Sequence, residues 1–64
     1  MVYSIFDDGN LVVSFEDEET ACGALERIAR EDPRLRDRLV LIAFDEDGDV
    51  VSEWIPGEHV SHAA

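Results

Sequence analysis

The sequence has no lysine, a single cysteine and no long uninterrupted apolar run. The lone Cys22 cannot form an internal disulfide, and the Cys/His spacing of a structural zinc site is absent. The chain therefore lacks the disulfides and metal sites that usually stabilise a very small domain. No run approaches the roughly 18 to 20 apolar residues of a membrane span, and the first residues lack the layout of a signal peptide. We therefore expect a cytoplasmic protein without a membrane partner.

Positive charge is also scarce. Sixteen Asp and Glu residues oppose five arginines, which gives a net charge of -11. Every arginine lies between Arg27 and Arg38. Such a field disfavours direct binding to the phosphate backbone of nucleic acids. The excess acid fits two interpretations, namely solubility or adaptation to a salty host on one side and a basic protein partner on the other.

Apolar residues are plentiful for a chain of this charge. The 64 residues are 45% hydrophobic, which is too apolar for a disordered segment. A chain of this length buries only about 60% of the surface that its unfolded form exposes, so it has room for one thin core. We predict a single domain over residues 1–55 and a flexible C-terminal tail over residues 56–64. Self-association or a bound partner would supply the stability that disulfides or a metal site give to other small domains.

The first half of the chain predicts a hairpin followed by a helix. Two β-branched and aromatic runs, 2–6 and 11–15, flank an Asp-Gly turn signal, which favours a hairpin. Asp17 is a good helix N-cap, and Ala21, Ala24, Leu25 and Ile28 then fall on one helix face. We expect Asp32-Pro33 to end this helix and residues 33–38 to add one further helical turn.

The second half predicts another hairpin. Runs 39–44 and 50–55 surround the loop Asp45-Glu46-Asp47-Gly48-Asp49, which resembles the first turn with one extra residue. The fold class is therefore α+β with ββαββ order, a four-stranded, mainly antiparallel sheet that carries one helix on one face.

Loop length sets which side chains share a sheet face. A two-residue loop in the first hairpin and a three-residue loop in the second place one set of side chains beneath the helix, namely Val2, Phe6, Leu11, Val13, Phe15, Val40, Ile42, Phe44, Val50 and Trp54. The other face then carries a second apolar set: Tyr3, Ile5, Val12, Leu41, Ala43 and Val51. An uncovered patch of this kind is typical of a binding surface, so we predict that this second set binds a partner.

The directions of the strands predict where the acidic side chains lie. The second hairpin tip should reach the end of the sheet where the helix starts, which gathers eight carboxylates at one acidic pole: Glu16, Asp17, Glu18, Glu19, Asp45, Glu46, Asp47 and Asp49. The first hairpin tip should lie near the arginines. Salt would screen the repulsion at the acidic pole.

Catalytic and metal-binding patterns are weak. An EF-hand loop that began at Asp45 would need glycine where Val50 stands and a bidentate glutamate where Pro56 stands. His59 and His62 have no third zinc ligand nearby, and Cys22 lacks the partners of a nucleophile. We expect no enzyme activity, no metal and no cofactor.

Two classes of function remain. The first is a small acidic protein-interaction module, a homodimer or subunit, that binds a protein through the apolar sheet face and the acidic pole. The second is a nucleic-acid-mimicking inhibitor or antitoxin-like neutraliser of a basic protein. A mimic would carry its acid in a band, whereas the strand directions gather it at one end.

Overall fold

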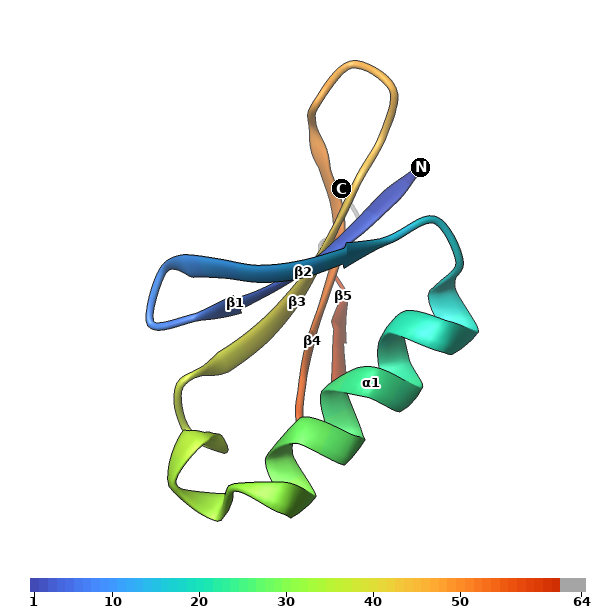
Figure 1. Cartoon of the computed structure of the whole chain (residues 1–64). Helices are drawn as coiled ribbons and strands as arrows, with labels where there is room; N and C mark the ends of the chain where they lie inside the picture. Colours follow the sequence, from blue (N-terminus) through green and yellow to red (C-terminus); the bar gives the residue numbers. More distant parts are fainter. Residues whose placement is uncertain (62–64) are drawn as a thin grey trace.

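The computed structural model describes residues 1–61 and shows an α+β fold, with one helix against one antiparallel sheet (Figure 1). The sheet order is β2-β1-β3-β4-β5, and every neighbouring pair is antiparallel. The elements of the described chain are β1 (Val2–Asp7), β2 (Asn10–Phe15), α1 (Glu18–Glu31), the 3-10 turn η1 (Pro33–Leu35), β3 (Leu39–Phe44), β4 (Val50–Ile55) and β5 (Glu58–Ser61). The predicted fold class is confirmed, and the predicted number of strands is one too few.

Both helical segments begin where the sequence predicts. The Asp17 carboxylate accepts hydrogen bonds from the backbone N–H of Thr20 at 2.8 Å and from its hydroxyl at 2.7 Å, which satisfies free donors of the first turn. Asp32 ends α1 and caps η1, whose first residue is Pro33.

Each of the first two hairpins turns as its loop length predicts. Asp8 and Gly9 have φ of 52° and 87°, the left-handed conformation that a two-residue turn requires, and Asp7 pairs with Asn10. In the second hairpin Gly48 has φ of 85°, and Phe44 pairs with Val50. The loops therefore set the first cross-strand pairs correctly.

A β-bulge in each of these two hairpins overturns the predicted assignment of faces. Phe6 pairs with Leu11, but Ile5 then pairs with Val13, so Val12 is an extra residue in its strand. In the second hairpin Phe44 pairs with Val50 and Ala43 pairs with Ser52, so Val51 is the extra residue of its strand. An extra residue moves every later side chain of that strand to the other face. Val13, Phe15 and Trp54 therefore lie on the same side as Tyr3, Ile5 and Leu41.

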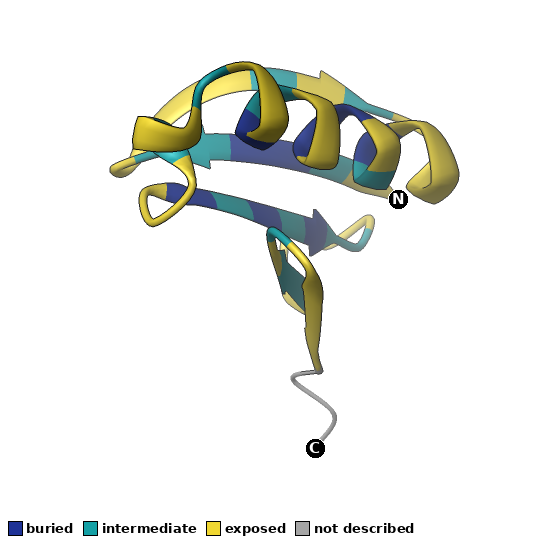
Figure 2. Cartoon of the chain, turned by 90° about the horizontal axis from the view of Figure 1, so that it is seen from below, coloured by how far each residue is buried: buried dark blue, intermediate teal, exposed yellow. Residues whose placement is uncertain are grey.

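The helix packs on the side of the sheet that carries Ile5, Leu41 and Trp54. The buried cluster joins four helix residues to the strands and consists of Ala21, Ala24, Leu25, Ala29, Ile5, Leu39 and Leu41. The helix contacts β1, β2 and β3, and the β4–β5 hairpin twists away from it (Figure 2). One side of the sheet therefore has no helix over it.

The chain continues into a strand where we predicted a tail. Pro56 and Gly57 form a tight turn, with Gly57 at φ of 85°, and β5 then pairs with β4 from Ile55 opposite Glu58 onward. The Gly57 N–H also donates to a Glu26 carboxylate oxygen at 2.7 Å, which ties the turn to the helix. The four-strand prediction is wrong because Pro-Gly connects two strands here and does not end the sheet. Residues 62–64 of the predicted tail lie outside the described residues.

Candidate functional site

The six side chains predicted to bind a partner do not share an exposed face. Ile5, Leu41 and Ala43 are 0%, 0% and 1% exposed and lie on the helix side of the sheet. Tyr3 is half-buried and packs against the same core. Val12 and Val51 are the two bulge residues and are exposed. The assignment of this face is therefore wrong, because the bulges were not foreseen.

An apolar face does exist, on the side of the sheet that the helix leaves uncovered. We call it the open face and define it by nine side chains that alternate with the buried ones along the paired strands: Val2, Phe6, Leu11, Val40, Ile42, Phe44, Val50, Ile55 and Val60. Five of them are exposed by 38% to 61%, namely Val2, Leu11, Val50, Ile55 and Val60. Seven of the nine belong to the set that the sequence placed beneath the helix.

The centre of the open face is partly closed by its own side chains. The rings of Phe6 and Phe44 meet edge to face, with their centroids 6.4 Å apart. Ser4 lies between them along the strands, is only 6% exposed, and shares a hydrogen bond of 2.8 Å with the hydroxyl of Ser14. This bond gives the buried Ser4 hydroxyl a partner, and the side chains around it are apolar.

Charge enters the open face only near one edge. In residues 1–61, the carboxylates on this side of the strands are Glu53 of β4 and Glu58 of β5. Glu53 is half-buried between Ile42 and Val60, which are its cross-strand neighbours. The rest of the face, over β1, β2 and β3, carries apolar and hydroxyl side chains.

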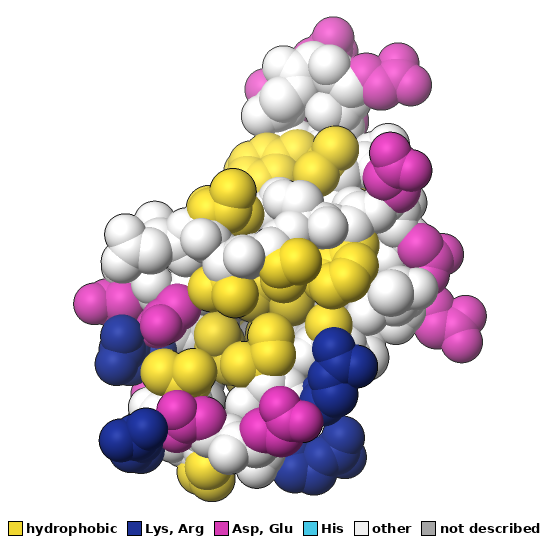
Figure 3. All heavy atoms as spheres, viewed as in Figure 1, with side chains coloured by type: hydrophobic (Ala, Val, Ile, Leu, Met, Phe, Trp, Pro, Cys, Tyr) yellow, Lys and Arg dark blue, Asp and Glu magenta, His cyan; other side chains and the backbone are white. Residues whose placement is uncertain are grey.

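The acidic pole lies at the end of the sheet where its strand directions predict it. Phe15, the last residue of β2, pairs with Tyr3, which pairs with Ala43 near the end of β3. Residues 16–19 and the β3–β4 loop therefore leave the sheet at the same end. Figure 3 shows acidic side chains over the projecting β3–β4 loop at the top and others along the right side, above the helix start.

Three carboxylates of the β3–β4 loop converge. Asp45, Asp47 and Asp49 each place an oxygen within 4.8 Å of the others. Asp45 accepts hydrogen bonds from the backbone N–H groups of Asp47 and Asp49 at 2.9 and 3.0 Å, so its role in shaping the loop explains its position. The arrangement offers oxygen ligands that suit a hard cation, but it does not complete the ligand set of an EF-hand.

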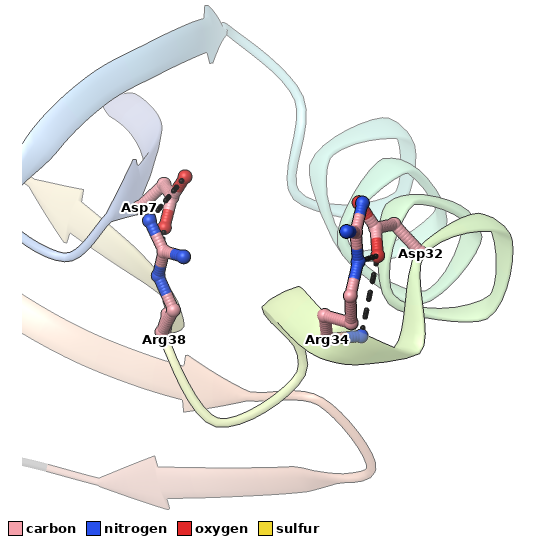
Figure 4. Close-up of polar contacts among 4 residues, drawn as sticks. All are labelled: Asp7, Asp32, Arg34 and Arg38. Atoms are coloured by element: carbon pink, nitrogen blue, oxygen red, sulfur yellow. Dashed lines mark hydrogen bonds and ion pairs between the residues drawn. The ribbon is translucent and has the colours of Figure 1, made fainter.

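The opposite end of the sheet holds the arginines. The Arg38 Nε lies 3.0 Å from Asp7 Oδ1, and the Arg38 carbonyl accepts from the backbone N–H of Asp8 at 3.0 Å (Figure 4). Arg34 pairs with Asp32 at 3.0 Å, and these contacts lower the pKa of the Asp32 carboxyl. The predicted proximity of the first hairpin tip to the arginines is confirmed. Each of these two ion pairs neutralises one arginine with one aspartate.

Cys22 is poorly placed for nucleophilic chemistry. Its partial burial, and then the nearby carboxylates of Glu18 and Glu26, raise the pKa of the thiol. His59, one of the two histidines considered for zinc, stacks on Trp54 with ring centroids 4.5 Å apart and an angle of 12° between the rings. His62, the other histidine considered for zinc, lies outside the described residues.

Sequence reasoning missed two open-face residues of the C-terminal hairpin. Val60 joins the face because β5 pairs with β4, and Ile55 joins it because the bulge at Val51 shifts the later residues of β4. One signal was present, because a proline-glycine pair such as Pro56-Gly57 is a common turn.

Comparison of the chain with protein-family models, with curated proteins and with solved structures finds no match. Within residues 1–61, no helix is long and apolar enough to cross a membrane.

Proposed function

We propose that this chain is a protein-interaction module that buries the open face of its sheet against another protein surface. The observation that carries the proposal is the continuous apolar character of a sheet face that no element of the described chain covers. The solvated face of a sheet normally carries polar residues, whereas this one has apolar side chains on all five strands and carboxylates only on β4 and β5.

The exposed area sets the strength of such binding. The five most exposed open-face side chains are each roughly half exposed, so their burial contributes about 1 kcal/mol apiece. A total of about 5 kcal/mol is near the lower limit of the cost of association, estimated at about 4 to 15 kcal/mol. The apolar contacts alone therefore support weak binding, and a tight complex also needs a partner that fits the Phe6 and Phe44 rings.

The acidic pole would then act on partner choice and encounter rate. Charge complementarity excludes wrong partners and speeds association more than it adds affinity. The eight carboxylates lie beside the open face and not on it, so they would contact the rim of a bound partner.

A capture experiment tests the proposal with two lysine variants. Ile42→Lys places a charge at the centre of the open face. Gly23→Lys adds the same charge on the helix surface, where a new Cβ meets no atom within 4 Å. Immobilised wild-type protein and Gly23→Lys should retain the same partner, whether a second copy or another protein, and Ile42→Lys should lose it. Equal retention by all three proteins would refute a role for the open face.

Nucleic-acid mimicry is the second candidate, and the acidic character of the chain is the observation in its favour. A mimic needs carboxylates spaced along a surface like phosphates, and the strand register gathers eight of them at one end. Its partner would be basic and would elute from the captured complex at molar salt. A partner held by the open face should stay bound under the same wash, because salt does not weaken apolar contacts.

A further inference from the structure

We infer that the occupant of the open face is a second copy of this chain, stacked face to face so that the acidic pole of each copy lies over the arginine end of the other. This inference rests on the proposed function, since it names the partner of the same face. The area of the face, its twist and the charge distribution around it support the inference.

The area of the face is near the lower limit of a specific dimer. Four strands of six residues and the four-residue β5, about 4.8 Å apart and about 3.3 Å per residue, give a footprint of roughly 440 Å². Two copies would bury roughly 900 Å², close to the roughly 1,000 Å² that a specific interface requires. A smaller partner surface would leave part of the face wet, whereas a second copy has the same dimensions.

The twist of the sheet also favours a copy of itself. The strands turn progressively, so that the β4–β5 hairpin lies at a marked angle to β1 and β2 (Figure 2). Two twisted sheets pack face to face with their strand directions within about 30° of each other. A flat partner would touch only the middle of this face. The two copies therefore align their strands, either in the same direction or in opposite directions.

Charge decides between these two directions. A two-fold axis along the strands stacks acidic pole on acidic pole, and an axis across the strands stacks acidic pole on arginine end. Like charges repel, and the first arrangement opposes eight carboxylates to eight. At the other end five arginines largely offset their neighbouring acids. The opposed arrangement has the weaker repulsion, and we expect it to be favoured by about tenfold.

Cysteine cross-linking in solution, at three positions of the open face, distinguishes the two relative strand directions of the dimer. Val2 and Val50 both pair with Phe44, at the acidic end, and Ile55 lies at the other end of β4. All three are exposed, and each would be replaced by cysteine in a Cys22→Ser background. The opposed dimer brings position 50 of one copy near position 55 of the other. The dimer with strands in the same direction brings position 50 near position 2.

Equimolar mixtures are oxidised with copper phenanthroline, and intact mass identifies which disulfide forms. We expect Val50→Cys to cross-link to Ile55→Cys about tenfold more than to Val2→Cys. The reverse preference would overturn the opposed arrangement and leave the proposed function standing.

Sedimentation of the wild-type protein and of both lysine variants from micromolar to millimolar concentration separates the remaining outcomes. A dimer that Ile42→Lys dissociates and Gly23→Lys preserves supports the inference. A wild-type monomer at every concentration overturns the second copy as occupant, and the capture experiment then decides the proposed function alone. A dimer that Ile42→Lys leaves intact forms through another surface and overturns the inference, and the capture experiment again decides the proposed function.

Discussion

Two neighbouring residues of the central strand provide the sharpest test of which sheet face the helix covers. Leu41 is fully buried beneath α1, whereas Ile42 points to the open face and is half-buried. Truncation of a buried leucine removes its transfer free energy and leaves a cavity, at a cost of about 2 to 5 kcal/mol. Truncation of Ile42 to alanine in the monomer leaves no enclosed cavity and should cost about 1 kcal/mol.

The difference is large for so small a domain. At about 0.05 to 0.15 kcal/mol per residue, the whole chain has a free energy of unfolding of roughly 3 to 10 kcal/mol. Leu41→Ala therefore removes much of the stability. With a urea m-value of about 1 kcal/mol/M, a difference of about 2 kcal/mol separates the two unfolding midpoints by about 2 M.

The assay is urea unfolding followed by Trp54 fluorescence, at dilute concentrations where association does not contribute. If Leu41→Ala is too unstable to fold, Ile5→Val on the same side should still fold and lose about 0.5 to 1.5 kcal/mol. A larger loss for Ile42→Ala than for Leu41→Ala would refute the bulged register and restore the unbulged one.

Three further predictions concern charge. The melting temperature should rise between low and molar salt because salt screens the acidic pole, and a flat response would contradict the gathering of acid there. Asp17→Ala should lower the melting temperature at neutral pH, and Glu16→Ala should not. Because the hydrogen bonds from Thr20 lower the pKa of Asp17 in the folded state, the difference between wild type and Asp17→Ala should shrink as the pH falls through that value. Cys22 should react with iodoacetamide more slowly than an unfolded cysteine, and Glu18→Gln should speed the reaction, because burial and that carboxylate raise the pKa of the thiol. An unchanged rate in Glu18→Gln would refute the electrostatic part of this explanation.

The sequence by itself determined the local structure. Asp17 and Asp32 begin the helical segments because their carboxylates accept backbone N–H groups within three residues, and these contacts need no distant partner. Asp8-Gly9 and Gly48 set the hairpin turns because few residues adopt a positive φ. Strand direction followed from these elements, and it placed Arg38 near the first hairpin tip and the acidic residues at the opposite end.

Only the tertiary structure decided which face the helix covers. Residues 39–44 are apolar at every position, so the strand carries no alternation from which a buried side can be read. The bulges at Val12 and Val51 then move Phe15 and Trp54 to the side of Leu41, and no local signal marks either valine as the extra residue. The helix covers the side that carries Ile5, Leu41 and Trp54, and that packing joins residues that are far apart in the sequence.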